Sequence, residues 1–296
     1  MLSVIESVNA AVNNFIWGVP AMICIIGVGL YLSIRTNFLQ IRKFPYAIRV
    51  TIGRMLRKRE ASDGSLTPFQ AVCTALAATV GTGNIAGVAG AIAIGGPGAV
   101  FWMWVIATIG AASGFVESTL AQIYKEKDGE VFRGGPAYYI EKALGNRFLG
   151  IVFAVLLISC FIFGFNGLQS YNVSSAMAYY FDNEQLCALL VGTILSVASA
   201  FVIFGGVHRI GVMSSRIVPV MAGLYILLGI YITLMNINQL PHLFAMIFEN
   251  AFDTKAIFGG FTGSCVMYGI KRGLFSNEAG MGSAPNAGAT ADVSHP

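Results

Sequence analysis

The chain has 296 residues, of which 56% are hydrophobic and only 11% are charged, and its mean hydropathy is +0.71. Soluble domains carry about 25% charged residues, so this composition excludes an ordinary soluble domain and indicates a polytopic membrane protein. The net charge of +4 gives no reason to expect a nucleic-acid partner, because the basic residues cluster in loops between apolar segments. The five cysteines lie in or beside these segments without C-x-x-C spacing, which predicts buried thiols rather than disulfides or a zinc site.

Seven segments approach the roughly 20 apolar residues that a membrane-crossing helix needs. In chain order, the predicted spans are 15–34, 69–94, 99–124, 148–169, 186–205, 217–234 and a seventh that begins near Phe258 and continues through 268–285. Two shorter segments, 41–55 and 137–144, are predicted to lie along the membrane surface.

Basic residues predict the orientation of these spans. Eight Lys or Arg residues lie between positions 35 and 59, five lie between 125 and 147, and two lie at 209 and 216, whereas the alternate loops hold almost none. Because cytoplasmic loops are enriched in Lys and Arg, this alternation predicts an N-terminus outside the cell and a second span that starts from the cytoplasm.

The second predicted span carries an unusual glycine-rich segment, 80–87, with the sequence VGTGNIAG. Each glycine in a helix interior costs about 1 kcal/mol relative to alanine, and an opened backbone in lipid is tolerated only where protein or water supplies hydrogen-bond partners. One interpretation is a broken helix, with the carbonyls from Ala78 to Gly81 and the Asn84 side chain suited to Na⁺. Asn84 is then expected to cap the helix that restarts, with its first N–H groups facing a carboxylate. The alternative is close packing of two helices through Gly83-x-x-x-Gly87.

A second polar segment, 271–282, follows an apolar half-span and contains Lys271, Arg272, Glu278 and three glycines. Ionisable residues at membrane depth are costly and usually functional. This segment is either an ordinary loop after Ile270 or a second broken helix. The charge alternation favours the broken helix, because residues 258–270 alone are too short to cross the membrane.

Several amides gather near the predicted end of the fourth span, at 164–172. Gln169 is a candidate for contacting a substrate amine or carboxylate, and the alternative is a polar helix end in the outer interface. No catalytic or ATP-binding motif occurs in a supporting context, so an enzyme is not expected, and transport would have to be coupled to an ion gradient.

Four motifs strongly resemble the alanine or glycine:cation symporter family, the sodium:alanine symporters. They lie, in this order and across essentially the whole chain, at 80–89 (VGTGNIAGVA), 96–99 (GPGA), 134–140 (GGPAYYI) and 272–285 (RGLFSNEAGMGSAP). The resemblance implies an all-α integral membrane protein of the leucine-transporter type. It has an extra N-terminal helix at 15–34, a first five-helix repeat at 69–234 and the start of an inverted second repeat at 258–296.

The resemblance also implies a function. The family couples the inward movement of Na⁺, sometimes H⁺, to uptake of alanine or glycine across the cell membrane by alternating access, with Na⁺ as the coupling ion and no other cofactor. The residues implied to bind substrate are Thr82, Gly83, Asn84, Gln169, Phe275 and Ser276.

Members of the family are much longer than this chain. We therefore expect a C-terminally truncated portion that holds one repeat and the opening helix of the other. A transport-inactive remnant and a membrane-embedded amino-acid sensor remain the alternative functions. A channel is less favoured, because the sequence contains neither a repeated ring of acidic residues nor a carbonyl filter sequence.

Overall fold

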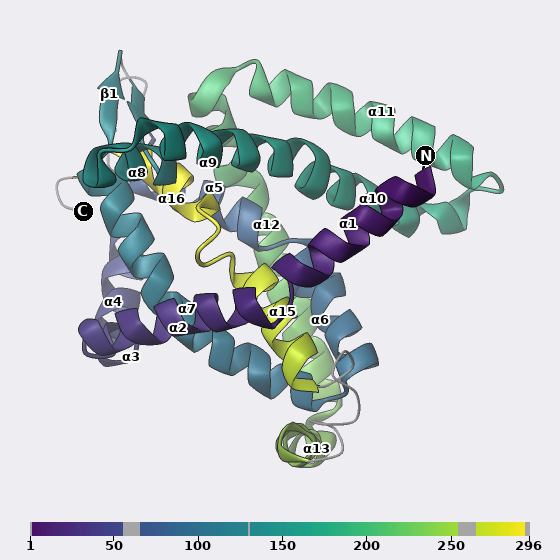
Figure 1. Cartoon of the computed structure of the whole chain (residues 1–296). Helices are drawn as coiled ribbons and strands as arrows, with labels where there is room; N and C mark the ends of the chain where they lie inside the picture. The colour runs from purple at the N-terminus through teal and green to yellow at the C-terminus, as the bar shows by residue number, and fades with distance from the viewer. Residues whose placement is uncertain (1, 56–65, 130, 254–264, 294–296) are drawn as a thin grey trace. The chain divides into compact units, whose positions relative to one another are not determined.

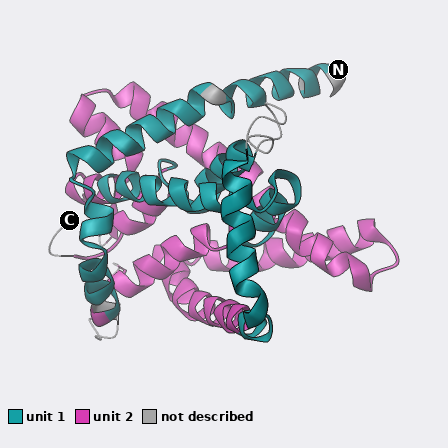
Figure 2. Cartoon of the chain, turned by 90° about the horizontal axis from the view of Figure 1, so that it is seen from below, with its two compact units in different colours: residues 1–52, 85–116, 231–281 teal, residues 53–84, 117–230, 282–296 magenta. Residues whose placement is uncertain are grey.

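The computed structural model of the chain describes residues 2–55, 66–129, 131–253 and 265–293. Within these ranges the chain is helical apart from one two-stranded hairpin and one isolated bridge (Figure 1). It divides into two compact units, each assembled from three separate stretches of sequence (Figure 2). Unit 1 contains residues 1–52, 85–116 and 231–281, and unit 2 contains residues 53–84, 117–230 and 282–296.

The N-terminal part of unit 1 is a helix with a break near its middle. α1 (Leu2–Ile16) and α2 (Val19–Arg35) are separated at Trp17 and Gly18, and Pro20 lies in the first turn of α2. Proline fits the first turn because it lacks the N–H that has no helical partner there. The short α3 (Leu39–Arg42) and the basic, amphipathic α4 (Phe44–Met55) follow, so the surface segment predicted at 41–55 is helical.

The second span consists of two helices, α5 (Pro68–Thr79) and α6 (Thr82–Gly95). α5 begins with a reciprocal cap, in which the Gln70 N–H donates to Thr67 Oγ1 at 3.2 Å and the Thr67 N–H donates to Gln70 Oε1 at 3.0 Å. Such a cap satisfies two N–H groups that the first helical turn would leave without partners. After a turn at Gly96, where φ is +80°, the chain enters α7 (Gly98–Ile123).

A small hairpin and a short helix connect the third and fourth spans. β1 (Glu126–Asp128) pairs antiparallel with β2 (Val131–Arg133), and α8 (Pro136–Leu144) follows, which confirms a short helix at the segment predicted at 137–144. The fourth span then consists of α9 (Arg147–Ser159), the π-helical η1 (Cys160–Phe165), α10 (Asn166–Met177) and the 3₁₀ turn η2 (Ala178–Tyr180).

The remaining helices complete both units. α11 (Glu184–Ile203) and α12 (Gly206–Met235) belong mainly to unit 2. The 3₁₀ turn η3 (Ile237–Gln239), α13 (Leu240–Phe252) and α15 (Cys265–Asn277) belong to unit 1, and α16 (Ser283–Ala289) returns to unit 2.

Six helical stretches in the described part of the chain are long and apolar enough to cross a membrane, and they confirm that the first six predicted spans exist, though not every predicted boundary. These stretches are Glu6–Arg35, Pro68–Gly95, Gly98–Ile123, Arg147–Tyr180, Glu184–Ile203 and Gly206–Met235. In the most apolar window of the last stretch only 6% of the residues are buried, which suits a helix whose neighbours include lipid. Residues 258–264 of the predicted seventh span lie outside the described ranges, and the rest of that span forms α15 and α16.

In unit 1, α7 and α15 run in the same direction and touch through glycines of α15. A Cβ added at Gly269 would lie 2.6 Å from the backbone oxygen of Ala99, and one added at Gly273 would lie 3.2 Å from Met103 Cα. Close approach of this kind is how membrane helices gain packing energy where lipid provides no hydrophobic drive between them. In unit 2, α8 packs on α9, α10 packs on α11, and α16 packs on α5.

Candidate substrate and ion site

The first helix break lies between α5 and α6. α5 ends at Thr79, Val80 and Gly81 leave the helix, and α6 begins at Thr82. The Asn84 side chain bridges this gap, because its Nδ2 donates a 2.5 Å hydrogen bond to the carbonyl oxygen of Thr79. The break predicted in the second span is therefore confirmed.

The observed role of Asn84 corrects the prediction that it caps the restarting helix. Asn84 is the third residue of α6, and its amide group satisfies a carbonyl at the end of the preceding helix. Its backbone N–H, which was expected to face a ligand, donates to the Gly81 oxygen at 3.1 Å. The two half-helices thus satisfy part of each other's hydrogen bonding, which an opened backbone in lipid requires.

Gln169 lies beside this break, within the same unit. A Cβ added at Gly81 would be only 3.0 Å from Gln169 Nε2, so this side-chain amide faces the Gly81 backbone. Gln169 is half-buried and belongs to α10, well inside a helical stretch that continues to Tyr180. The prediction that the fourth span ends near Gln169 is therefore wrong, because the helix continues through its amides.

A π-helical segment directly precedes α10. In η1, residues 160–165 carry the wider hydrogen-bond pattern of a π-helix, and Asn166 follows as the first residue of α10. Single π-turns inside α-helices occur frequently at functional sites, because the inserted residue changes the direction in which later side chains point. The sequence carried no signal for this turn beyond the glycine at position 164.

The second break lies between α15 and α16. Residues 278–282 leave the helix, with positive φ angles at Glu278 (52°), Gly280 (89°) and Gly282 (83°). Glu278 is only 4% exposed and, as a non-glycine residue in the left-handed region, it occupies a costly conformation. The Ala279 N–H donates to Asn277 Oδ1 at 2.8 Å, which partly replaces the missing helical bonds. The broken-helix interpretation of this segment is confirmed within the described residues.

The predicted substrate residues are divided between the two compact units. Gly81, Asn84 and Gln169 belong to unit 2, whereas the half-buried Phe275 and Ser276 lie in the last turn of α15 in unit 1. Gly83 is half-buried in the first turn of α6. The structure thus places the Gln169 side chain beside the Gly81 backbone. It also places the Asn84 side chain against the end of α5.

The two broken helices meet in an arrangement that no sequence pattern indicated. In unit 2, Leu66 ahead of α5 forms a parallel bridge with Ala291 beyond α16. The end of α7 and the residues just after it hydrogen-bond to the second segment. Gln122 Nε2 donates to the Gly288 oxygen at 2.5 Å, and Lys125 Nζ donates to the Ala291 oxygen at 2.9 Å. Burial lowers the pKa of Lys125 below its usual range, and the nearby carboxylate of Asp292 opposes that shift.

The groups at the first break are hard oxygen donors. Ala78, Gly81 and Asn84 are all half-buried, and backbone carbonyls with a side-chain amide oxygen are the ligand types that hard cations accept. In the described part of the chain, His, Cys, Asp and Glu side chains form no group of three that could hold a metal ion. Neutral carbonyl oxygens at the ends of half-helices coordinate monovalent ions in secondary transporters.

Two broken helices in a multi-span chain, with a polar side chain facing one break, are typical of ion-coupled membrane transporters. The sequence profile described as "Sodium:alanine symporter family" matches residues 2–296. The chain belongs to this family, and it is therefore a multi-pass membrane protein of a sodium-coupled amino-acid symporter family.

Relatives give the same result. The chain is 48% identical over 298 residues to the "Probable sodium/glutamine symporter GlnT" of Bacillus subtilis, covering 100% of this chain and 61% of the relative. It is 48% identical over 291 residues to the "Amino-acid carrier protein AlsT" of the same organism, covering 97% and 61%. It is 44% identical over 292 residues to the "Sodium/alanine symporter AgcS" of Methanococcus maripaludis, covering 96% and 63%. The chain thus spans about three fifths of the length of these relatives.

Proposed function

We propose that this chain supplies the two broken helices of a symporter that couples Na⁺ entry to uptake of a small neutral amino acid, alanine or glycine. The observation that carries the proposal is the position of Gln169 against the opened backbone at Gly81. A helix break beside a half-buried amide offers donors and acceptors to both charged ends of an amino acid. Thr82, Gly83 and Asn84, at the start of α6, would contact the substrate beside this break.

In this proposal Na⁺ binds the oxygens of Ala78, Gly81 and Asn84. The Asn84 amide now donates through Nδ2 to Thr79, so ion binding requires its Oδ1 to turn toward the break. Binding of Na⁺ would then replace one hydrogen bond between the half-helices by ion coordination. A coupling ion must bind one state of the transporter better than another, and this exchange supplies such a difference.

The wider mechanism follows from the family fold. We propose a leucine-transporter-type arrangement in which α5 to α12 form the first repeat and α15 with α16 opens the inverted second repeat. Phe275 and Ser276, in the last turn of α15, would complete the substrate pocket. Alternating access would then rock one helix bundle against the rest, with the N-terminus outside the cell.

Glutamine is a second candidate substrate. It is supported by the 48% identity to a relative named as a sodium/glutamine symporter. Uptake of labelled alanine, glycine and glutamine into proteoliposomes, with and without a Na⁺ gradient, would rank the three. Binding without any uptake, by protein expressed from the complete reading frame, would instead favour the amino-acid sensor or the inactive remnant.

The site itself is tested by Asn84→Ala in the same preparation. We expect Na⁺-dependent uptake to fall by about 10–100-fold, which corresponds to the loss of a hydrogen bond or ligand to a charged group. Asn172→Ala is the matched control, because Asn172 is likewise half-buried on α10 and its amide donates to the Leu168 oxygen one turn away. Wild-type uptake by Asn84→Ala would refute the site assignment, whereas Asn172→Ala should retain activity.

A further inference from the structure

A cavity of about 530 Å³ lies in unit 2 and is built by β1, α8 and the start of α9, and its lining includes no residue of either helix break. α7 and α9 are the helices of two neighbouring membrane spans, and α8 lies in the connection between the end of one and the beginning of the other. The cavity must therefore lie at one surface of the membrane. The five basic residues between positions 125 and 147 indicate the cytoplasmic surface.

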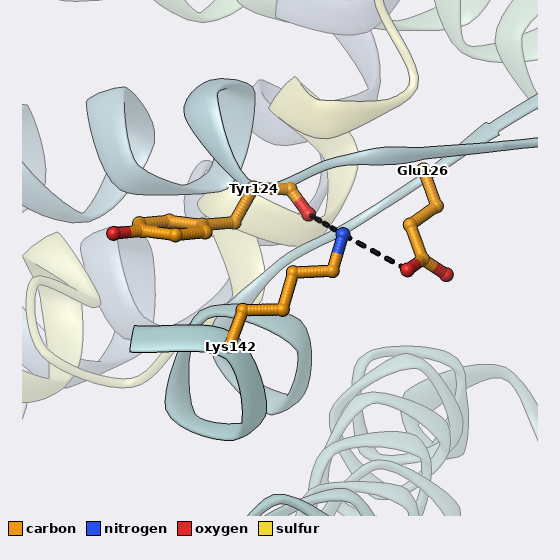
Figure 3. A network of polar contacts seen from close by, with 3 residues as sticks. All are labelled: Tyr124, Glu126 and Lys142. Atoms are coloured by element: carbon orange, nitrogen blue, oxygen red, sulfur yellow. Dashed lines mark hydrogen bonds and ion pairs between the residues drawn. The ribbon is translucent and has the colours of Figure 1, made fainter. Parts of the chain in front are cut away.

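Four charged side chains line the cavity, and two of them, Lys142 and Glu126, form an ion pair with each other. Lys142 Nζ lies 2.9 Å from Glu126 Oε1 and donates a 3.1 Å hydrogen bond to the Tyr124 oxygen, as Figure 3 shows. These contacts join α8 to the chain directly after α7. Lys142 is thus held by the protein and is not the group that a ligand would meet first.

The other two charges, Glu141 and Arg147, also line the cavity. Both side chains are exposed, and among the described residues neither forms an ion pair or a side-chain hydrogen bond, not even with the other. The cavity therefore presents one negative and one positive group that are separate and available. Such a pair complements a ligand that carries both charges, and it favours neither a simple anion nor a simple cation.

The floor of the cavity continues onto an apolar surface. Gly150 packs so closely on α8 that an added Cβ would lie 2.8 Å from the Ala137 oxygen, and Ile151 lies beside it in the cavity lining. Ile151, Val155 and Ile158 are 52%, 57% and 58% exposed. Their spacing of four and three residues places them on one face of α9, so an apolar stripe leads from the cavity into the membrane span.

We propose that this cavity binds the headgroup of a zwitterionic phospholipid with a primary amine, phosphatidylethanolamine. Arg147 would hold the phosphate, because a guanidinium matches phosphate oxygens in a two-pronged geometry. Glu141 would accept hydrogen bonds from the ammonium group, and an acyl chain would follow the stripe from Ile151. Phosphatidylcholine has the same charges, but its methylated nitrogen has no N–H to donate, and phosphatidylglycerol offers no cation to Glu141.

The proposal is independent of transport and is tested by lipid binding. The purified protein is incubated with equimolar phosphatidylethanolamine, phosphatidylcholine and phosphatidylglycerol, and bound lipid is counted by native mass spectrometry. We expect a preference for phosphatidylethanolamine over phosphatidylcholine of about two- to fivefold, the size of one partly exposed ionic contact. Glu141→Gln should reduce this ratio to about one, and Arg147→Gln should reduce binding of all three lipids at this site.

Two further measurements complete the test. Glu184→Gln and Arg216→Gln remove exposed charges outside the cavity and should leave the preference unchanged. Glu141→Lys replaces the negative group by a positive one and should shift the preference toward the anionic phosphatidylglycerol. A misfolded variant would lose lipid binding and would not gain a new preference. Equal binding of the three lipids by the wild-type chain, or an unchanged preference in Glu141→Gln, would overturn the proposal. Equally strong binding of soluble glycerophosphoethanolamine, which lacks acyl chains, would also overturn it, because the ligand would then not be a lipid.

Discussion

Replacing Gly269 with alanine tests the close contact of α15 with α7. The new Cβ would lie 2.6 Å from the Ala99 backbone oxygen and 2.6 Å from Trp102 Cβ. Ordinary contacts of a Cβ begin at 3.4 Å, so the two helices must separate locally by about 0.8 Å. Neither neighbour is the flexible end of a side chain, so the strain has to be taken up by the backbone.

The expected cost follows from this displacement. Overpacking of a well-packed interior destabilises proteins by about 1–3 kcal/mol. Alanine is also the better helix former by about 1 kcal/mol, which offsets part of the loss. Gly229→Ala in α12 provides the control, because no atom lies within 4 Å of the Cβ it adds. Since both variants gain the same helix propensity, the difference between them isolates the packing cost of about 1–3 kcal/mol.

The assay is denaturation of the two purified variants and the wild-type protein in the same detergent, followed by loss of the monodisperse folded species. We expect Gly269→Ala to denature earlier than Gly229→Ala, and Gly229→Ala to equal or exceed the wild-type protein. If the two variants denature together, α15 and α7 do not touch at Gly269, and the packing described for unit 1 is wrong.

Two further predictions concern unit 2. Burial raises the pKa of Tyr139 to about 12, so the native state keeps this proton from about pH 10, where an unfolded tyrosine loses it, up to pH 12. The free energy of unfolding should therefore fall as pH rises from about 10 to 12. In Tyr139→Phe this fall should be smaller. Identical curves of unfolding free energy against pH for the two proteins would contradict the prediction. Gly81→Ala places a methyl group 3.0 Å from the Gln169 amide, which is the movable end of a side chain. We therefore expect the free energy of unfolding to change by less than about 1 kcal/mol. Because the amide has to move, we expect the KM for amino-acid uptake to rise several-fold. An unchanged KM would argue against a substrate role for this pair.

The boundary of the fourth span shows where sequence reasoning fails. The amides around Gln169 lower the local hydropathy, which placed the end of the span there. The helix nevertheless continues through α10 and η2 to Tyr180, because a helix satisfies its backbone hydrogen bonds internally whatever its side chains are. Asn84 is a second example. The sequence predicted that Asn84 lies at the helix break, but it did not predict that its side chain donates to the Thr79 oxygen, because that contact depends on where α6 begins.

The sequence by itself determined the membrane class, six of the spans and both helix breaks. These properties are local, since hydropathy, helix length and the backbone freedom of glycine act over short stretches of chain. Only the tertiary structure decided which segments meet. The pairing of α5 with α16, the approach of Gln169 to Gly81, and the contacts of Gln122 and Lys125 with residues 166 positions later join parts of the chain that no spacing rule connects. Their physical cause is packing between distant surfaces, which arises only once the helices have assembled.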